Sequence, residues 1–299
     1  MEPTNSNRIL VCIDFQEQSM NALHQCYDLA RFVKAEILLL YVIESSDLFS
    51  GFNPSNIEDA RRDIEGKLKQ IAEKEYASTD IPFSYAVEVG KVHECILRKA
   101  KEQKVNFIVM GKNGTNQGLR KFLGSNTIKV LSESPCPVIT LKGRYSIGFK
   151  NIVLPLNLNK GTQEKVAHAI SFSKFFGSHI HIVSVHSGGI VLPTSRIFNR
   201  LKKVQRAFRI NGIACTNKLF RRSEKNDHEH VLDYAKEINA DLIMVMARAE
   251  GRHWDHYIGS FAYRIINESE IPVLSIIPFT TQKHGETFVE AMVDPFNLF

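Results

Sequence analysis

The chain has 299 residues, of which 43% are hydrophobic, and a formal net charge of +6 at pH 7. This apolar content is that of a globular protein and excludes a disordered chain, which buries too little apolar surface to offset the entropy of ordering. Because a domain usually takes about 100–200 residues, the length predicts two domains. The five cysteines include no C-x-x-C pair, so we expect neither a disulfide framework nor a zinc ribbon.

The sequence gives no sign of a membrane or secretory segment. No apolar run reaches the roughly 18 residues that a membrane-spanning helix needs. The N-terminal segment MEPTNSNRILVCID lacks the charged start and long apolar core of a signal peptide. We therefore expect a cytoplasmic protein without a membrane span. The modest positive charge does not by itself indicate nucleic acid, and a nucleic-acid partner is not expected.

Strand-like and helical patterns alternate through the first half of the chain. Short apolar runs predict five buried strands, at residues 9–13, 37–43, 83–89, 107–110 and 137–141. Helical spacing or helix-prone composition occurs between them, at residues 23–33, 57–76, 92–101 and 125–134. Strands that alternate with helices imply right-handed crossovers and a parallel sheet covered on both faces.

The second half repeats this series of elements. Its predicted strands are at residues 152–156, 180–185, 214–219, 242–246 and 273–277, with helices at 162–176, 194–209, 228–238 and 260–268. The pairs Gly124-Ser125 and Gly259-Ser260 stand in corresponding places, at the start of the last helix of each half. We therefore predict an α/β fold of two tandem doubly wound domains, each with a five-stranded parallel sheet. The domains are residues 1–146 and 147–279, followed by a C-terminal tail at 280–299.

A glycine-rich loop follows the fourth strand of the first copy. Gly111 and Gly114 stand at the strand exit, and Gly124 and Ser125 stand at the start of the next helix. Glycines let backbone N–H groups approach a ligand closely, and a helix N terminus favours an anion, so this arrangement suits a phosphate. Ser125 is also a candidate helix N-cap. The alternative interpretation is a flexible loop that precedes a capped helix.

The spacing Gly-x2-Gly-x9-Gly-Ser, after a strand of a five-stranded α/β unit, resembles the nucleotide-binding motif of the universal stress protein family. Asp14 at the end of the first strand and the closing segment SESPCPVITL agree with this resemblance. Since the likeness spans nearly all of both copies, the chain resembles a tandem-domain universal stress protein. The resemblance implies a fold of the adenine nucleotide alpha hydrolase-like type.

The resemblance also implies an adenine-nucleotide site in the first domain. In ATP-binding members of the family, the aspartate at the position of Asp14 contacts the nucleoside end. The residues at the positions of Cys12 and Ile13 line the adenine pocket there, and the one at Val42 packs on the base. These side chains suit the roles, because a carboxylate accepts hydrogen bonds from hydroxyls or an amine and the other three are apolar.

The phosphate end of the implied site lies in the glycine-rich loop. The resemblance places Met110 and Gly111 under the ribose and phosphates, and it surrounds the phosphates with Gly114, Gly124, Ser125 and Asn126. Mg²⁺ would accompany the phosphates of ATP, although the sequence contains no dedicated set of carboxylates for it. Lys112 is a further candidate for a phosphate contact, with a solvated loop lysine as the alternative.

The second copy departs from this pattern. Alignment of the fourth strands puts Met246 and Ala249 at the first two glycine positions, and Asn157 replaces the aspartate. Only Gly259 and Ser260 remain. Side chains at the first two positions would obstruct a close approach of backbone to phosphate. We therefore predict that the second copy does not bind ATP in the family manner.

The second copy also carries a basic segment. Residues 196–222 contain nine basic residues and no acidic one. Ile197, Leu201 and Val204 share one helical face, and Lys203 and Arg206 lie on another. The preferred interpretation is a surface helix packed on the sheet. Contact with a membrane, nucleic acid or an acidic partner is the alternative.

Together these features predict a stress-response protein whose first domain binds ATP or another adenine nucleotide as a ligand-dependent regulator. No paired acid and base is recognisable, so we expect at most weak ATP hydrolysis. The alternative is an interaction scaffold that binds no nucleotide and uses the duplicated fold and the basic helix. Family members commonly dimerise through their last strands, so residues 137–141 and 272–277 would form an intrachain pseudo-dimer, with a homodimer left open.

Overall fold

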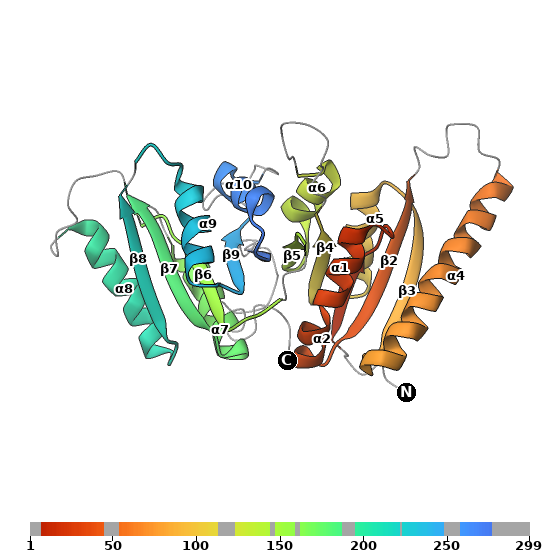
Figure 1. Ribbon diagram of the computed structural model, residues 1–299, viewed down its shortest axis with the longest axis horizontal. Coiled ribbons are helices and arrows are strands. Elements are labelled where there is room, and N and C mark those ends of the chain that lie inside the picture. The colour runs from red at the N-terminus through yellow and green to blue at the C-terminus, as the bar shows by residue number, and fades with distance from the viewer. Residues whose placement is uncertain are drawn as a thin grey trace, which may run out of the picture. The chain divides into compact units, whose positions relative to one another are not determined.

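The computed structural model describes residues 7–44, 54–112, 123–143, 147–158, 162–186, 195–221, 223–247 and 258–276. These residues form two compact units, one that ends at Tyr145 and one that begins at Ser146. Figure 1 shows that each unit is a twisted sheet with helices packed against it. None of the helices in these ranges is long and apolar enough to cross a membrane.

The first unit is a five-stranded parallel sheet with helices in the connections. Its strands are β1 (Arg8–Cys12), β2 (Glu36–Glu44), β3 (Phe83–Gly90), β4 (Phe107–Gly111) and β5 (Val138–Leu141). Its helices are α1 (Glu17–Gln25), α2 (Tyr27–Val33), α4 (Pro54–Thr79), α5 (Val92–Glu102) and α6 (Ser125–Glu133). The strand order is β3-β2-β1-β4-β5, so the winding reverses between β1 and β4. Sheets of this kind bind ligands beyond the carboxyl ends of the strands at that reversal.

The second unit repeats the same topology. Its strands are β6 (Asn151–Pro155), β7 (His179–His186), β8 (Cys215–Arg221), β9 (Leu242–Met246) and β10 (Val273–Ile276). Its helices are α7 (Gln163–Phe176), α8 (Arg196–Ile210), α9 (Asp227–Glu237) and α10 (Ser260–Glu268). The strand order β8-β7-β6-β9-β10 matches that of the first unit. The predicted tandem, doubly wound α/β fold is therefore confirmed.

The central strands of both units form their cores. Ile9, Leu10 and Val11 of β1 are fully buried, as are Ile152 and Val153 of β6. Consecutive residues of a strand face opposite sides of a sheet, so burial of adjacent residues means that both sides are covered. This explains why these strands are nearly continuous apolar runs in the sequence.

A histidine lies in the core of the second unit and makes its stability depend on pH. His168 of α7 is buried, and this burial lowers its pKa from 6.5 to about 4. Because the pKa is lower in the folded state, the unfolded chain binds this proton more readily as the pH falls from 6.5 toward 4. Stability is therefore complete above pH 6.5 and decreases through that window, by about 2 kcal/mol at pH 5.

Replacing His168 with leucine should remove this contribution. Urea unfolding followed by circular dichroism at pH 7 and pH 5 would give the change in free energy for each protein. We expect the free energy of unfolding to fall between pH 7 and pH 5 by about 2 kcal/mol less in His168→Leu than in the wild type. Equal losses in both proteins would contradict a buried, neutral His168.

Candidate functional site

Sheet register brings several predicted site residues to the same edge of the first unit. Cys12 of β1 pairs with Leu40 of β2 and with Met110 of β4. Asp14 and Val42 each lie two residues beyond that level, on their own chains. They therefore stand at the carboxyl ends of β1 and β2, next to the point where the strand order reverses.

The turn after β1 fixes the position of Asp14. Its carboxylate oxygen Oδ1 accepts the N–H of Gln16 at 2.9 Å, and its own N–H donates to the hydroxyl of Ser19 at 3.3 Å. Phe15 has a left-handed backbone, with φ of 60°, and its ring stacks on Tyr41 at 5.1 Å between centroids. Bulky residues rarely adopt this conformation, so the stacked ring stabilises an otherwise unfavourable turn. The exposed Asp14 carboxylate retains acceptor capacity at the sheet edge.

The remaining residues of the predicted nucleoside end are apolar and lie at the same edge of the sheet. Ile13 and Met110 are buried, whereas Cys12 and Val42 are partly accessible. Desolvation by burial, assisted by the nearby Asp14 carboxylate, raises the pKa of the Cys12 thiol. The thiol is therefore neutral at physiological pH and behaves as a small apolar group.

Gly111 has a packing role that the sequence interpretation did not identify. A Cβ atom on Gly111 would lie 2.3 Å from the carbonyl oxygen of Gln18 and 2.8 Å from the nitrogen of Ser19. The backbone of α1 thus lies directly against the end of β4. The packing of α1 against β4 therefore requires a glycine at this position, whether or not a ligand is bound. The sequence signal for it is weak, because the glycine and the helix are distant along the chain.

Gly124 has a different environment. It stands at the N-cap position of α6 with φ of −59°, and a Cβ there would meet only Thr127 Oγ1, at 3.9 Å. No backbone strain and no close described neighbour therefore requires a glycine. No acceptor among the described residues takes its N–H group, and no described side chain caps α6. The N terminus of α6 thus has both open space beside Gly124 and backbone N–H groups that could donate to a ligand.

Ser125 and Asn126 follow as the first two residues of α6. Ser125 is exposed, and Asn126 is partly buried. The prediction that Ser125 is the N-cap is wrong, because the extended backbone of Gly124 precedes the helix and Ser125 already belongs to its first turn. The exposed Ser125 hydroxyl still stands beside the backbone N–H groups of that turn, so it remains a candidate ligand donor.

Two other residues of the glycine-rich loop, Lys112 and Gly114, are sequence-based candidates for phosphate contacts. Gly114 lies outside the described residues. Lys112, by contrast, is buried, and its N–H donates to the carbonyl of Leu141 at 2.8 Å. The alternative of a solvated loop lysine is therefore wrong for Lys112.

The corresponding edge of the second unit is built differently. Met246 occupies the position in β9 that Gly111 occupies in β4. Met246 pairs with Ile276, the last residue of β10, and Gly111 pairs with Leu141, the last residue of β5. Seven residues separate β6 from α7, against four between β1 and α1. The helix of the second unit thus begins farther along the chain, and the bulkier Met246 side chain is buried. Asn157 is exposed where the first unit has Asp14, and Ala249 lies outside the described residues.

A backbone hydrogen bond also occupies the donor that corresponds to Gly124. The N–H of Gly259 donates to the carbonyl oxygen of Ala247 at 3.1 Å. This bond joins the residue after β9 to the residue before α10. The equivalent donor of the first unit has no partner among the described residues. The two helix termini share a sequence, Gly-Ser, but differ in the availability of their first N–H group.

A hollow lies next to the candidate site. It has a volume of about 450 Å³ and is lined by Phe15, Lys67, Gln70, Ile71 and Lys74. Phe15 connects it to the turn that carries Asp14. None of the predicted site residues lines it. No spacing in the sequence indicates it, because α4 meets the β1–α1 turn only in the folded chain.

The described residues contain no group of three or more His, Cys, Asp or Glu side chains placed to hold a metal ion. A cation at this edge would therefore depend on other ligands, such as the oxygens of a bound anion and water. The observed donor set, backbone N–H groups, a serine hydroxyl and an amide, suits an anion rather than a cation.

Comparison with known proteins identifies the family. The model of the Universal stress protein family matches residues 5–142 and 148–276. Universal stress protein MJ0577 of Methanocaldococcus jannaschii is 29% identical over 157 residues, which cover 46% of this chain and 96% of that protein. Universal stress protein YxiE of Bacillus subtilis is 30% identical over 146 residues, which cover 46% of this chain and 99% of that protein.

A solved structure matches both units together. The crystal structure of a universal stress protein from Archaeoglobus fulgidus aligns with a TM-score of 0.72 and 23% identity, and the alignment covers 92% of this chain and 99% of that chain. At this identity the match establishes the fold. Because the family model matches both halves, the chain belongs to the universal stress protein family as a tandem-domain member.

Proposed function

We propose that the first unit binds an adenine nucleotide such as ATP and that its occupancy regulates a stress response. The carrying observation is the terminus of α6, where Gly124 leaves space and an N–H group without a described acceptor. A helix N terminus with uncapped N–H groups favours a phosphate through both hydrogen bonds and the helix dipole. The resemblance to ATP-binding family members, which implies site residues at this edge, supports the proposal.

The proposed site divides into two ends. Asp14 would accept hydrogen bonds from the nucleoside, and the apolar residues Cys12, Ile13, Val42 and Met110 would contribute to the pocket for the base. The phosphates would be held by backbone and side-chain donors from Gly111, Gly114, Gly124, Ser125 and Asn126. A bound nucleotide would supply phosphate oxygens that could carry Mg²⁺. We assign no cation ligand in the protein itself.

Regulation by occupancy fits these residues better than rapid turnover. The exposed Asp14 has no paired acid or base in a described catalytic arrangement. Binding would instead connect elements that are distant in the sequence: the end of β1, the end of β2 and the start of α6. A ligand that contacts all three stabilises their mutual arrangement and so favours one conformation of the first unit.

We also propose that the second unit does not bind ATP in this way. The N–H of Gly259 already donates to Ala247, and Met246 carries a buried side chain at the glycine position. Binding a phosphate at this terminus would require breaking the Gly259–Ala247 hydrogen bond. The second unit would then act as a structural partner of the nucleotide-binding unit.

The nucleotide content of the purified protein tests these proposals. The protein is denatured, the supernatant is analysed by anion-exchange chromatography, and ligand-free protein is titrated with ATP and Mg²⁺ by calorimetry. We expect close to one adenine nucleotide per chain. Two per chain would contradict the inactive second unit. No nucleotide and no binding at millimolar ATP would contradict the proposed function and favour the interaction scaffold.

A further inference from the structure

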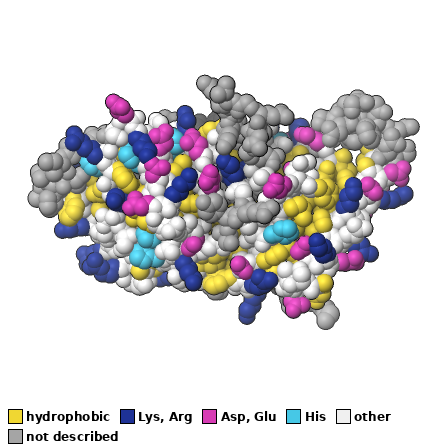
Figure 2. Space-filling model, viewed as in Figure 1, with side chains coloured by type: hydrophobic (Ala, Val, Ile, Leu, Met, Phe, Trp, Pro, Cys, Tyr) yellow, Lys and Arg dark blue, Asp and Glu magenta, His cyan; other side chains and the backbone are white. Residues whose placement is uncertain are grey.

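The cations of α8 lack carboxylate partners among the described residues, whereas most cations of α4 and α5 have them. Within the described part of the chain, no ion pair joins the α8 cations to Asp or Glu. The helix has six basic residues and no acidic one: Arg196, Arg200, Lys202, Lys203, Arg206 and Arg209. Figure 1 labels this helix, and Figure 2 shows Lys and Arg side chains on the surface of the unit that contains it.

The first unit provides an internal comparison. Its helix α4 occupies the same place in the topology, after the second strand, and carries both signs of charge. Ion pairs within that helix neutralise four of its cations: Arg61 with Glu65, Arg62 with Asp59, Lys67 with Asp63, and Lys69 with Glu73. Uncompensated charge is therefore not a requirement of this position in the fold.

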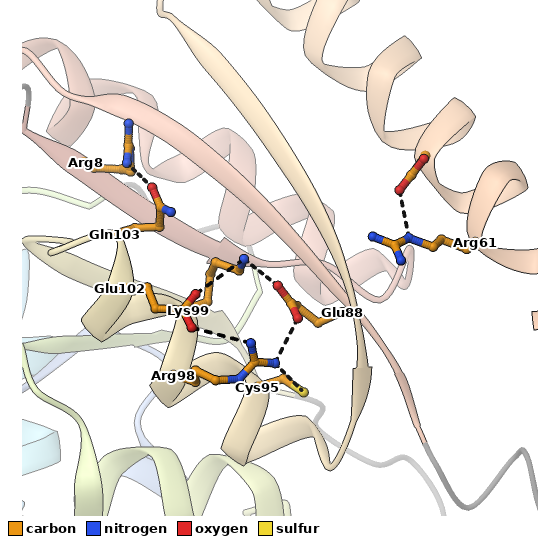
Figure 3. Close-up of polar contacts among 9 residues, drawn as sticks. Arg8, Arg61, Glu88, Cys95, Arg98, Lys99, Glu102 and Gln103 are labelled. Atoms are coloured by element: carbon orange, nitrogen blue, oxygen red, sulfur yellow. Dashed lines mark hydrogen bonds and ion pairs between the residues drawn. The ribbon is translucent and has the colours of Figure 1, made fainter. Parts of the chain in front are cut away.

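The nearby helix α5 follows the same rule. Figure 3 shows Glu88 between Arg98 and Lys99, with Glu102 completing the cluster, and Arg61 of α4 beside its own carboxylate partner. The Arg98 and Lys99 side chains lower the pKa of the Glu88 carboxyl against the effect of its burial. Arg98 and Lys99 of α5 thus have local anions, whereas the cations of α8 have no carboxylate partner among the described residues.

Two of the six cations have other contacts that position the helix. Arg200 donates from Nη1 to the carbonyl of Leu158 at 2.7 Å, and the Lys202 ammonium lies 4.7 Å from the centre of the Phe198 ring. The remaining four, Arg196, Lys203, Arg206 and Arg209, are exposed. They extend over about 20 Å along the helix, given a rise of about 1.5 Å per residue.

The apolar face of α8 is already used by the fold. Leu201, Val204 and Phe208 are buried within the second unit. A helix that binds a membrane surface inserts its apolar face into the lipid, and this face is not available. The interior of a protein–protein interface is depleted in charge and enriched in aromatic residues, whereas the exposed face of α8 is mainly cationic, with Ile210 as its exposed apolar side chain.

We propose that the exposed face of α8, with Arg221 of the neighbouring strand β8, binds the phosphate backbone of nucleic acid without sequence preference. Arg221 is exposed at the end of β8. Non-specific binding of nucleic acid rests on contacts between Lys or Arg and phosphates and needs no apolar centre. Arginine guanidinium groups also bind phosphates through two parallel hydrogen bonds. The concentration of positive charge on α8 therefore supports a nucleic-acid partner, although the net charge of the whole chain does not indicate one.

A charge-removal variant tests this proposal in the full-length chain. The variant combines Lys203→Gln, Arg206→Gln and Arg209→Gln, all at exposed positions. The matched control combines Arg62→Gln, Lys67→Gln and Lys69→Gln on α4, which removes the same formal charge. Fluorescence anisotropy measures binding to a labelled 20-base-pair DNA duplex of mixed sequence and to the matching single strand, over 50–200 mM salt. Circular dichroism verifies that both variants fold.

We expect the wild type and the control to bind both DNA forms, with affinity that falls steeply as salt rises. The α8 variant should bind at least 10-fold more weakly at 50 mM salt. On the duplex, its log–log salt slope should be smaller by about 3, because each lost phosphate contact removes about 0.9. Absence of DNA binding by the wild type at 50 mM salt would overturn the proposal, as would an equal loss in the control. Tighter binding of poly-glutamate or of phosphatidylserine vesicles than of DNA would overturn it in favour of an acidic protein or a membrane.

Discussion

Replacing Gly124 with valine should weaken ATP binding by the first unit at least 100-fold while the protein stays folded. The backbone at Gly124 is compatible with any residue, and the only described atom within 4 Å of a new Cβ is Thr127 Oγ1. The valine side chain would therefore occupy the space beside the N–H groups of α6 rather than clash with the fold. A phosphate held by these groups would lose its contacts and its place near the helix dipole.

The second unit supplies the matched control. Gly259 has nearly the same backbone conformation as Gly124, precedes the same residue type, and has no described atom within 4 Å of a Cβ. Both substitutions therefore have the same local cost at a helix N-cap. Calorimetric titration with ATP should show that Gly259→Val binds like the wild type.

Two outcomes would contradict this assignment. Unchanged ATP affinity in Gly124→Val would remove the terminus of α6 from the site. Equal weakening in both variants would mean that the second unit takes part in binding despite its Gly259–Ala247 hydrogen bond. Thermal unfolding of both variants, followed by circular dichroism, separates a loss of binding from a loss of structure.

The fold was predictable because its signals are local and occur twice. Buried runs such as residues 9–11 and 152–153 are nearly continuous, as strands covered on both faces require. The alternation of these runs with helical segments indicates the crossovers, and the repeat gives each element a second example. The N-cap of α6 was misassigned by one residue, because Gly124 and Ser125 are both acceptable caps and the choice depends on backbone dihedrals.

The roles of individual glycines were less accessible from the sequence. Gly111 and Gly124 belong to one motif, yet the first is needed for helix packing and the second leaves open space. The difference arises from where α1 crosses β4, which is a property of the folded chain. The Gly259–Ala247 hydrogen bond likewise depends on how the chain returns from β9 to α10. The charges of α8 were visible in the sequence, but their lack of described carboxylate neighbours required the structure.

The second large effect concerns Gly111, where even alanine should destabilise the protein by about 3 kcal/mol. The new Cβ would stand 2.3 Å from the Gln18 carbonyl oxygen, and the atoms that it meets are backbone atoms of α1. A flexible side chain could rotate away, whereas here α1 must shift from β4. Overpacking of this kind usually costs about 1–3 kcal/mol and more where the neighbour cannot move.

Gly66 in α4 provides the opposite case. A Cβ on Gly66 would meet nothing within 4 Å, and the residue lies inside a regular helix. Alanine at this site should stabilise the protein by about 0.5–1 kcal/mol, because it restricts the unfolded chain and favours the helix. Urea unfolding of the two variants and the wild type measures both effects on the same scale.

The contrast decides how substitutions in the glycine motif are to be interpreted. If Gly111→Ala loses stability and Gly66→Ala gains it, lost ATP binding in a Gly111 variant would report a displaced α1 rather than a blocked phosphate. The turn that holds Asp14 would move with that helix, because Ser19 of α1 accepts the Asp14 N–H. A Gly111→Ala protein as stable as the wild type would contradict the close packing of α1. In that case Gly111 would join Gly124 as a direct probe of the ligand.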